Sequence, residues 1–286
     1  LPLHDLRMRA TAVPVHGPSR LRSLDYCGPI DHAGPRFACI ARAFEAAREF
    51  SGRLDLSFEI TTRSDFPHER GLGSSAAAAG AIIRAVLDAC RRGASTSELF
   101  ALTQTAEKVA HGRPSGLDAA ATCSPCPIRF QGGQMRPLSQ HIERAHLVIA
   151  DSGVHGSTRE AVGALRRRYK EDTGTVGPLI GSLGALTRTA IAALNDGDAP
   201  ALGAAMNRAH AVLAELGLSL PILDGLTGAA RRAGALGAKL TGGGLGGCTI
   251  ALADGPGTAE RIRAELERAG AAATWTYRMR VSEADG

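Results

Sequence analysis

The chain has 286 residues, of which 44% are hydrophobic, 21% charged and 4% aromatic, so it can bury one large core or two smaller ones and is not a disordered segment. Its net charge of +5 comes from basic residues that are scattered or lie in short clusters with almost no aromatic residues among them, which favours no nucleic-acid partner. The sequence has six cysteines, no secretory leader pattern and no uncharged apolar run of about 18 residues. We therefore expect a reduced, cytoplasmic setting and no membrane partner.

The first half of the chain is predicted to mix strands and helices. Some segments alternate apolar and polar side chains, as half-buried strands do, and others carry apolar side chains at helical spacing. An alanine-rich helix is followed by a second helix, which is stopped by Gly112 and Pro114. Strands are expected over 6–16, 53–62 and 128–130, and helices over 34–50, 75–91 and 95–111.

After a predicted buried strand at 146–151, the pattern of the sequence changes to one that is mostly helical. The stretch 137–146 is the expected boundary, giving domains of 1–145 and 146–286. Several helices with few strands indicate an antiparallel sheet with helices on one side. Helices are expected over 157–171, 177–196, 198–216, 221–234 and 257–269, with strands at 246–253 and 273–281.

A glycine-containing loop, Gly71-Leu72-Gly73-Ser74-Ser75-Ala76, runs directly into a predicted helix. Glycines let the backbone approach a ligand closely, and the free N–H groups and the dipole at the start of a helix favour an anion such as phosphate. The loop is not a Walker A motif, because the lysine of that motif is missing. The alternative interpretation is a loop that only turns the chain and caps the helix.

A second motif places Glu107 near the end of one helix and Asp118 near the start of the next. Two carboxylates can divide the work, one holding Mg²⁺ through oxygen and the other orienting or deprotonating a hydroxyl nucleophile. The alternative is a solvated glutamate and a helix-capping aspartate, with Ser115 and Asp118 spaced as in a capping box. The nearby histidine His111 is interpreted as a helix-end or surface residue, as are His16 and His210.

The third motif has five glycines within residues 242–247, after Thr241 and before a predicted strand. So many glycines are costly in a loop that only connects, because each adds entropy to the unfolded chain. Close approach of this backbone to a ligand, or to the first glycine loop, is the better explanation.

With the three motifs in this order, the chain resembles the GHMP small-molecule kinases, and among them most closely the bacterial mevalonate kinases. The middle motif, Glu-x3-His-Gly-x-Pro-Ser-Gly-x-Asp, carries the distinction, since homoserine kinases and galactokinases share the two glycine loops. Residues 151–159 and 206–239 are also similar to the bacterial members. The resemblance implies an α+β, two-domain GHMP kinase fold, with an N-terminal domain like ribosomal protein S5 domain 2 and a ferredoxin-like C-terminal domain.

The resemblance further implies ATP-dependent phosphorylation of the C5 hydroxyl of (R)-mevalonate, with ATP, Mg²⁺ and this small-molecule substrate in the cleft between the domains. It makes Asp118 the catalytic aspartate and gives Mg²⁺ to Ser75 and Glu107. Thr158 is similar to the family's substrate-side threonine, and Arg159 would reach the mevalonate carboxylate. The implied nucleotide-binding residues are Gly71, Leu72, Gly73, Ser74, Ser75, Ala76, Thr241, Gly242, Gly243 and Gly244.

One family motif, a lysine-bearing strand followed by Gly-Glu-His, would precede Leu1, and we expect that a segment of the natural chain lies there. Two alternatives stay open on this sequence. One is another GHMP kinase, such as a phosphomevalonate or homoserine kinase, because the glycine loops do not name the acceptor. The other is a non-catalytic nucleotide- or metabolite-binding relative. A homodimer is kept open, since no residue decides the oligomeric state.

Overall fold

The structure is a computed structural model, and it describes residues 1–3, 5–68, 70–112, 114–156 and 158–283. Two compact units make up the chain, the first of residues 1–68 and 73–137 and the second of residues 69–72 and 138–286. The sequence predicted domains of 1–145 and 146–286, with no exchange of a loop. Residues 138–145 go with the second unit because Gln140 bridges to Ser282 and the Met279 N–H donates to the Ala145 carbonyl at 2.9 Å.

The first unit contains a four-stranded sheet in the order β1-β4-β2-β3. Strands β1 (Met8–Val15) and β4 (Ser57–Ser64) pair antiparallel, as do β2 (Arg20–Ser23) and β3 (Tyr26–Pro29), whereas β2 and β4 run parallel. The sequence predicted β1 and β4 and missed β2 and β3. A four-residue strand is too short to show a clear alternation of apolar and polar side chains.

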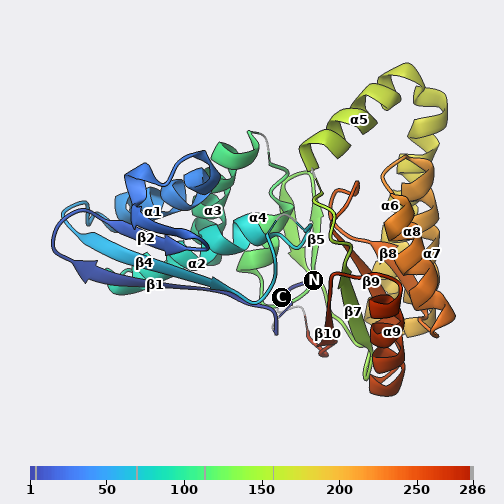
Figure 1. Ribbon diagram of the computed structural model, residues 1–286. Coiled ribbons are helices and arrows are strands. Elements are labelled where there is room, and N and C mark those ends of the chain that lie inside the picture. The colour runs from blue at the N-terminus through green and yellow to red at the C-terminus, as the bar shows by residue number, and fades with distance from the viewer. Residues whose placement is uncertain (4, 69, 113, 157, 284–286) are drawn as a thin grey trace. The chain divides into compact units, whose positions relative to one another are not determined.

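Helices of the first unit pack together beside this sheet (Figure 1). They are α1 (Ala38–Ser51), α2 (Ser74–Ala89), α3 (Thr96–His111) and the short α4 (Leu117–Cys123), and a hairpin of β5 (Ile128–Gln131) and β6 (Gln134–Pro137) follows. Alanines on α2 leave room for the large apolar side chains of the core, which include Phe44, Phe58, Ile60, Ile82 and Ile83.

The second unit contains an antiparallel sheet in the order β10-β7-β9-β8. Its strands are β7 (His146–Asp151), β8 (Gly237–Leu240), β9 (Cys248–Ala253) and β10 (Ala273–Arg278). Helices α8 (Pro221–Arg232) and α9 (Pro256–Arg268) pack on it, and the order β-α-β-β-α-β confirms the expected ferredoxin-like arrangement (Figure 1). The edge strand β8 was not predicted from the sequence.

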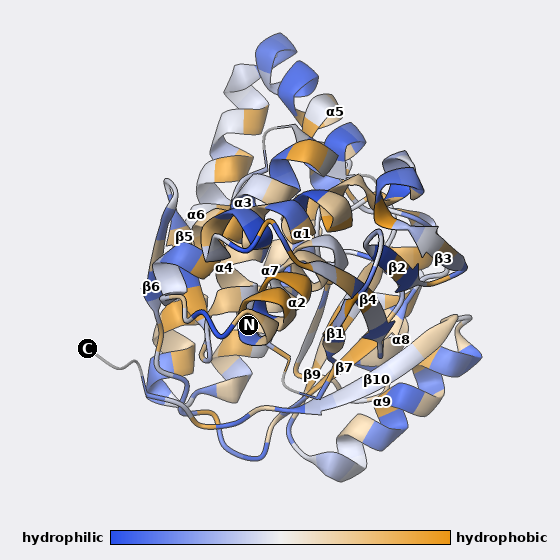
Figure 2. Ribbon diagram, turned by 90° about the vertical axis from the view of Figure 1, so that its left-hand side faces the viewer, coloured by the Kyte–Doolittle hydropathy of each residue, from blue (hydrophilic) through white to orange (hydrophobic). Residues whose placement is uncertain are grey.

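Three further helices, α5 (Thr158–Glu171), α6 (Thr173–Asp196) and α7 (Ala199–Glu215), lie between β7 and α8 in the chain. Figure 2 shows hydrophilic and hydrophobic residues alternating along α5 and α9, as expected for helices with one buried side. Helix α6 starts at Thr173 rather than 177, because Asp172 accepts a hydrogen bond from the Thr175 N–H at 3.0 Å and caps it.

Within the described residues, α6 is the one helix that is long and apolar enough to cross a membrane, with a mean hydropathy of 1.2 over its best 18-residue window. Only 11% of that window is buried in the structure. Length and composition alone do not assign it to a membrane.

Candidate functional site

The two glycine motifs are in direct backbone contact within the second unit. Gly71 has a φ of +73°, and a Cβ added there would lie 3.0 Å from the Thr241 carbonyl oxygen. A Cβ at Gly242 would lie 2.7 Å from the Gly71 Cα. Only glycine allows backbones to approach this closely, which confirms the expected approach of the third motif to the first loop.

Residues 70–72 are also held by a buried ion pair that sequence reasoning missed. The Arg70 Nε lies 3.1 Å from Asp151 Oδ2, with the two side chains only 13% and 5% exposed. Two of the guanidinium nitrogens are buried without a hydrogen bond, so the pair is mainly electrostatic. The Cys248 N–H donates to the Arg70 carbonyl at 3.1 Å and fixes the backbone. In the sequence, the feature that could have indicated this ion pair is Asp151, a charged residue at the end of an apolar strand.

Gly73 begins the part of the loop that belongs to the first unit. It is the N-cap of α2 with a φ of +67°, so no side chain occupies the cap, and Ser74, Ser75 and Ala76 form the first turn. The N–H groups of a first helical turn have no partner within the helix, and with the dipole they favour an anion. The loop therefore starts the helix through the backbone of Gly73, with no side-chain cap.

The structure brings together Ser75 and Glu107, the two residues to which the resemblance gives Mg²⁺. The Ser75 hydroxyl donates to Glu107 Oε1 at 2.5 Å, and the carboxylate is buried, with the residue 4% exposed. Among the described residues its ion-pair partner is His111, whose Nε2 lies 3.7 Å from Oε2. Adjacent hydroxyl and carboxylate oxygens are the donors that Mg²⁺ prefers, and a buried carboxylate with so weak a partner is suited to a cation.

Cys39 adjoins this oxygen pair and was not singled out from the sequence. Its thiol donates to Glu107 Oε1 at 3.4 Å, and the Ser75 hydroxyl lies 3.3 Å from its sulfur. Burial, opposed by the Ser75 hydrogen bond and aided by the Glu107 charge, raises the pKa of the Cys39 thiol to about 12. The thiol is therefore neutral at physiological pH and leaves the oxygens as the ligands for a hard cation.

Asp118 lies in the first turn of α4, close to the start of α2. A Cβ at Gly73 would lie 3.5 Å from Asp118 Oδ1. Desolvation by the atoms around it, followed by the charge of Glu107, raises the pKa of the Asp118 carboxyl, although the residue still reaches solvent. The capping-box alternative fails, because the N-cap of α4 is Gly116 and it is Ser115 that accepts from the Leu117 N–H.

In the second unit, Thr158 lies against the third motif. A Cβ at Gly243 would lie 3.0 Å from the Thr158 hydroxyl oxygen. Arg159 follows in the first turn of α5 and is exposed. The predicted residues other than Arg159 thus form two local groups, each described within its own unit: Gly73, Ser74, Ser75, Ala76, Glu107 and Asp118 in the first, and Gly71, Leu72, Thr158, Thr241, Gly242, Gly243 and Gly244 in the second.

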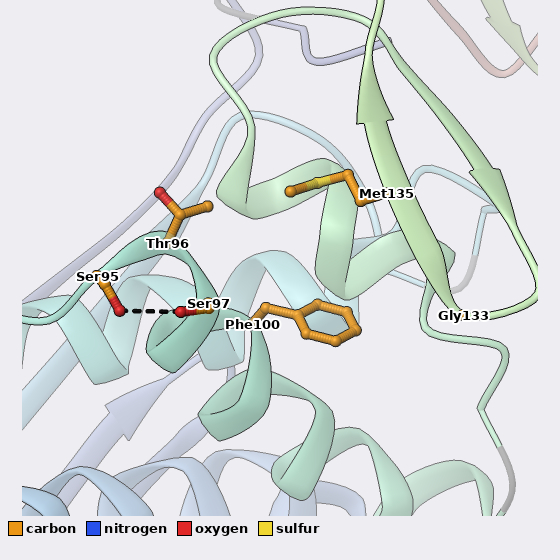
Figure 3. A pocket seen from close by; sticks show the side chains of 6 residues that line it. All are labelled: Ser95, Thr96, Ser97, Phe100, Gly133 and Met135. Atoms are coloured by element: carbon orange, nitrogen blue, oxygen red, sulfur yellow. Dashed lines mark hydrogen bonds between the residues drawn. The ribbon is translucent and has the colours of Figure 1, made fainter. Parts of the chain in front are cut away.

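A separate hollow in the first unit contains none of the predicted residues. It lies at the start of α3, where Phe100 and Met135 line it with Ser95, Thr96, Ser97 and Gly133 (Figure 3). The Ser95 and Ser97 hydroxyls are 3.1 Å apart and hydrogen-bonded, and Ser95 with Glu98 forms the capping box of α3. These polar groups are thus used in starting the helix.

Comparisons with known proteins agree with this arrangement. Residues 38–124 match the model of the GHMP kinases N terminal domain, and residues 190–272 match that of the GHMP kinases C terminal domain. A mevalonate kinase of Pyrococcus horikoshii is 35% identical over 233 residues, which are 80% of this chain and 68% of the relative. The chain spans about two thirds of the length of such curated relatives. These relatives are archaeal, whereas the sequence motifs had suggested bacterial ones.

Solved structures show the same fold. The mevalonate kinase of methicillin-resistant Staphylococcus aureus MRSA252 is 27% identical with a TM-score of 0.69, covering 95% of this chain and 86% of that one. The L. major mevalonate kinase, solved in complex with R-mevalonate, has a TM-score of 0.81 at 24% identity, covering 97% and 87%. Two family models in the expected order and a relative sharing a third of its residues over four fifths of the chain make this protein a member of the GHMP kinase family.

Proposed function

We propose that this protein transfers the γ-phosphoryl group of ATP to the C5 hydroxyl of (R)-mevalonate, giving ADP and 5-phosphomevalonate for isoprenoid precursor synthesis. The hydroxyl oxygen forms a bond to the γ-phosphorus, the bond from that phosphorus to the β,γ-bridging oxygen breaks, and the hydroxyl proton is released. The observation that carries the proposal is the group of Ser75, Glu107 and Asp118 around an uncapped helix start. The sequence relatives include mevalonate kinases, and this supports mevalonate as the acceptor.

The phosphates of ATP are assigned to the glycine motifs. Backbone N–H groups over residues 71–76, with the Ser74 hydroxyl, would hold the β- and γ-phosphates, and residues 241–244 would line the same side of the nucleotide. Phosphoryl transfer needs mainly positioning and neutralisation of charge, which preorganised N–H groups supply at no cost of reorganisation during the reaction.

Ser75 and Glu107 are the residues that would hold Mg²⁺. Their oxygens are adjacent, and the Glu107 carboxylate is already buried. When bound, Mg²⁺ neutralises charge on the phosphate oxygens. The serine hydroxyl donates to the carboxylate and keeps it oriented, and the neutral Cys39 thiol contacts the same carboxylate oxygen.

Asp118 is the group assigned to the acceptor hydroxyl. Its carboxylate accepts the hydroxyl proton as the oxygen becomes attached to phosphorus, and the raised pKa makes it a better proton acceptor than an ordinary aspartate. Thr158, with its hydroxyl against Gly243, and the exposed Arg159 are the residues that we assign to mevalonate, Arg159 to the carboxylate.

The test is ADP release with Mg-ATP and three acceptors, mevalonate, phosphomevalonate and homoserine, by this chain and by the longest natural chain that contains it. Turnover on mevalonate alone is the expected result. Turnover on another acceptor would move the assignment to a different GHMP kinase. ATP binding without turnover on any acceptor would favour a binding protein instead.

Replacing Glu107 with glutamine should raise the Mg²⁺ concentration needed for half-maximal activity by about tenfold or more, because one charged oxygen ligand is lost while the volume is kept. The direct measurement is Mg²⁺-dependent binding of an ATP analogue by calorimetry. Glu143→Gln, a change of an exposed glutamate, is the matched control and should bind as the original protein does. An unchanged Mg²⁺ dependence in Glu107→Gln would remove this residue from the metal site.

A further inference from the structure

The third glycine motif is entered through β8, and the outer edge of that strand is bonded by side chains of a helix. Strand β8 pairs only with β9 in the described sheet, and the Thr241 N–H donates to the Cys248 carbonyl on that side at 2.9 Å. Backbone N–H groups alternate in direction along a strand, so those of Ala238 and Leu240 point to the other side. Without acceptors there, two N–H groups would be left unpaired.

Helix α7 supplies those acceptors from one face. The Ala238 N–H donates to the Asn207 Oδ1 at 3.0 Å, and the Leu240 N–H donates to the His210 Nδ1 at 3.3 Å. Asn207 and His210 are three residues apart, so they project from the same side of the helix. A Cβ at Gly237 would lie 2.0 Å from the Gly203 carbonyl oxygen, which shows how closely α7 lies against the strand. The helix replaces the neighbouring strand that β8 lacks.

His210 is buried, with 5% of the residue exposed, and its second nitrogen is fixed as well. The Nε2 lies 3.1 Å from Asp224 Oδ1 and 3.0 Å from the Thr227 hydroxyl oxygen. The Thr227 hydroxyl donates to the Asp224 carbonyl at 3.1 Å, so its oxygen can accept from His210. Because Nδ1 accepts from Leu240, this network assigns the neutral ring with its proton on Nε2.

The same network reaches the far end of the glycine motif. The Ser219 hydroxyl donates to Asp224 Oδ1 at 2.6 Å. The preceding residue, Leu218, accepts a hydrogen bond from the Leu245 N–H at 2.8 Å through its carbonyl. A Cβ at Gly244 would lie 2.3 Å from that carbonyl oxygen, so the loop rests directly on residue 218.

We propose that His210 is a positioning residue for the loop 241–247, holding its start through Leu240 and its end through Asp224, Ser219 and Leu218. The inference rests on the proposed function, in which residues 241–244 line the phosphates of ATP. A loop that is fixed before ATP arrives loses less entropy on binding, so the network should lower the KM for ATP more than the KM for the acceptor. The ring must stay neutral for this, because a proton on Nδ1 removes the acceptor of the Leu240 N–H.

Two variants separate the two bonds of His210. In His210→Asn the side-chain oxygen occupies the position of Nδ1 and can still accept from Leu240, whereas in His210→Gln the amide reaches towards Asp224 and the Leu240 N–H is left unpaired. We expect His210→Gln to raise the KM for ATP about tenfold, with kcat and the KM for mevalonate changed less than twofold. His210→Asn keeps the bond to Leu240, which enters the loop directly, and loses only the longer route through Asp224, so it should stay within about twofold of the original KM for ATP. His32→Gln, an exposed histidine of the first unit, is the matched control.

A readout that needs no activity is hydrogen exchange of the peptide that covers residues 240–247. It should quicken in His210→Gln and stay near the original rate in His210→Asn. Equal exchange and equal KM values in the two variants would overturn the positioning role, even if the kinase reaction is confirmed. Conversely, faster hydrogen exchange in His210→Gln than in His210→Asn would support the positioning role of His210 even if the chain phosphorylates none of the acceptors.

The pH dependence is a second measurement, useful if His210→Gln does not fold. Burial lowers the pKa of His210, as do Arg231 and Lys239, and the charge of Asp224 opposes them. The ring is therefore neutral above its ordinary pKa of about 6.5 and gains its proton only in more acidic solution. The KM for ATP should be constant at neutral pH and rise only in more acidic solution, and in His210→Asn this rise should be absent. A rise that persists in His210→Asn would belong to another group.

Discussion

Replacing Asp118 with asparagine should lower kcat by roughly 10²–10⁴-fold, the usual contribution of a positioned general base, while the affinity for ATP changes less than about threefold. Asparagine keeps the volume and still lies beside Gly73, so the start of α2 should stay as it is. It cannot take the proton of the acceptor hydroxyl. Single-turnover kinetics with radiolabelled ATP separate this chemical step from nucleotide binding.

The matched control is Asp88→Asn, which changes an exposed aspartate on α2 and should leave kcat unaltered. Turnover by Asp118→Asn at the original rate would remove Asp118 from the reaction. A loss of ATP affinity as large as the loss of kcat would give the residue a role in nucleotide binding instead of proton transfer.

Replacing Asp151 with alanine should destabilise the second unit by about 3–5 kcal/mol, because the Arg70 guanidinium would stay buried without its opposite charge. Two nitrogens of that group already lack a hydrogen bond, so little remains to compensate the charge. The KM for ATP should rise as well, because the ion pair holds residues 70–72 in place and Gly71 packs against the backbone of the third motif. Urea unfolding followed by a probe in the second unit measures the first effect.

A double variant tests the cause. Arg70→Met with Asp151→Ala removes both charges and should be more stable than Asp151→Ala alone. The exposed pair of Arg42 and Glu49 is the control, and Glu49→Ala should cost less than about 1 kcal/mol. If the double variant is no more stable than the single one, the buried charge is not the reason for the loss.

The sequence predicted the elements that carry periodicity or an unusual composition. The long helices, the strands β1, β4, β7, β9 and β10 and the joint location of Ser75 and Glu107 all follow from local patterns or from the family motifs. Strands β2, β3 and β8 have four residues each and show too little alternation to be recognised. They are defined by the partners that they find elsewhere in the chain.

Side chains that act across long sequence separations were beyond such patterns. His210 was interpreted as a helix-end or surface histidine, and this was wrong, because the residue is buried and bonded to Leu240 and Asp224. No local pattern singled out Arg70, and its partner Asp151 was seen only as the end of a predicted strand. Each of these contacts depends on which elements pack together, and no local spacing records that.

Residues 70–72 come from the first half of the chain but belong to the second unit, and this affects the synthesis of the chain and any attempt to split it into two fragments. Arg70 leaves the ribosome long before Asp151 and Cys248, so this segment has no docking partner until the sheet of the second unit is synthesised. A fragment of residues 138–286 expressed alone would lack the partner of Asp151 and the acceptor of the Cys248 N–H. Cutting the gene at the boundary before residue 138 therefore separates residues 70–72 from their contacts in the second unit, and a short peptide containing them would be needed to restore those contacts.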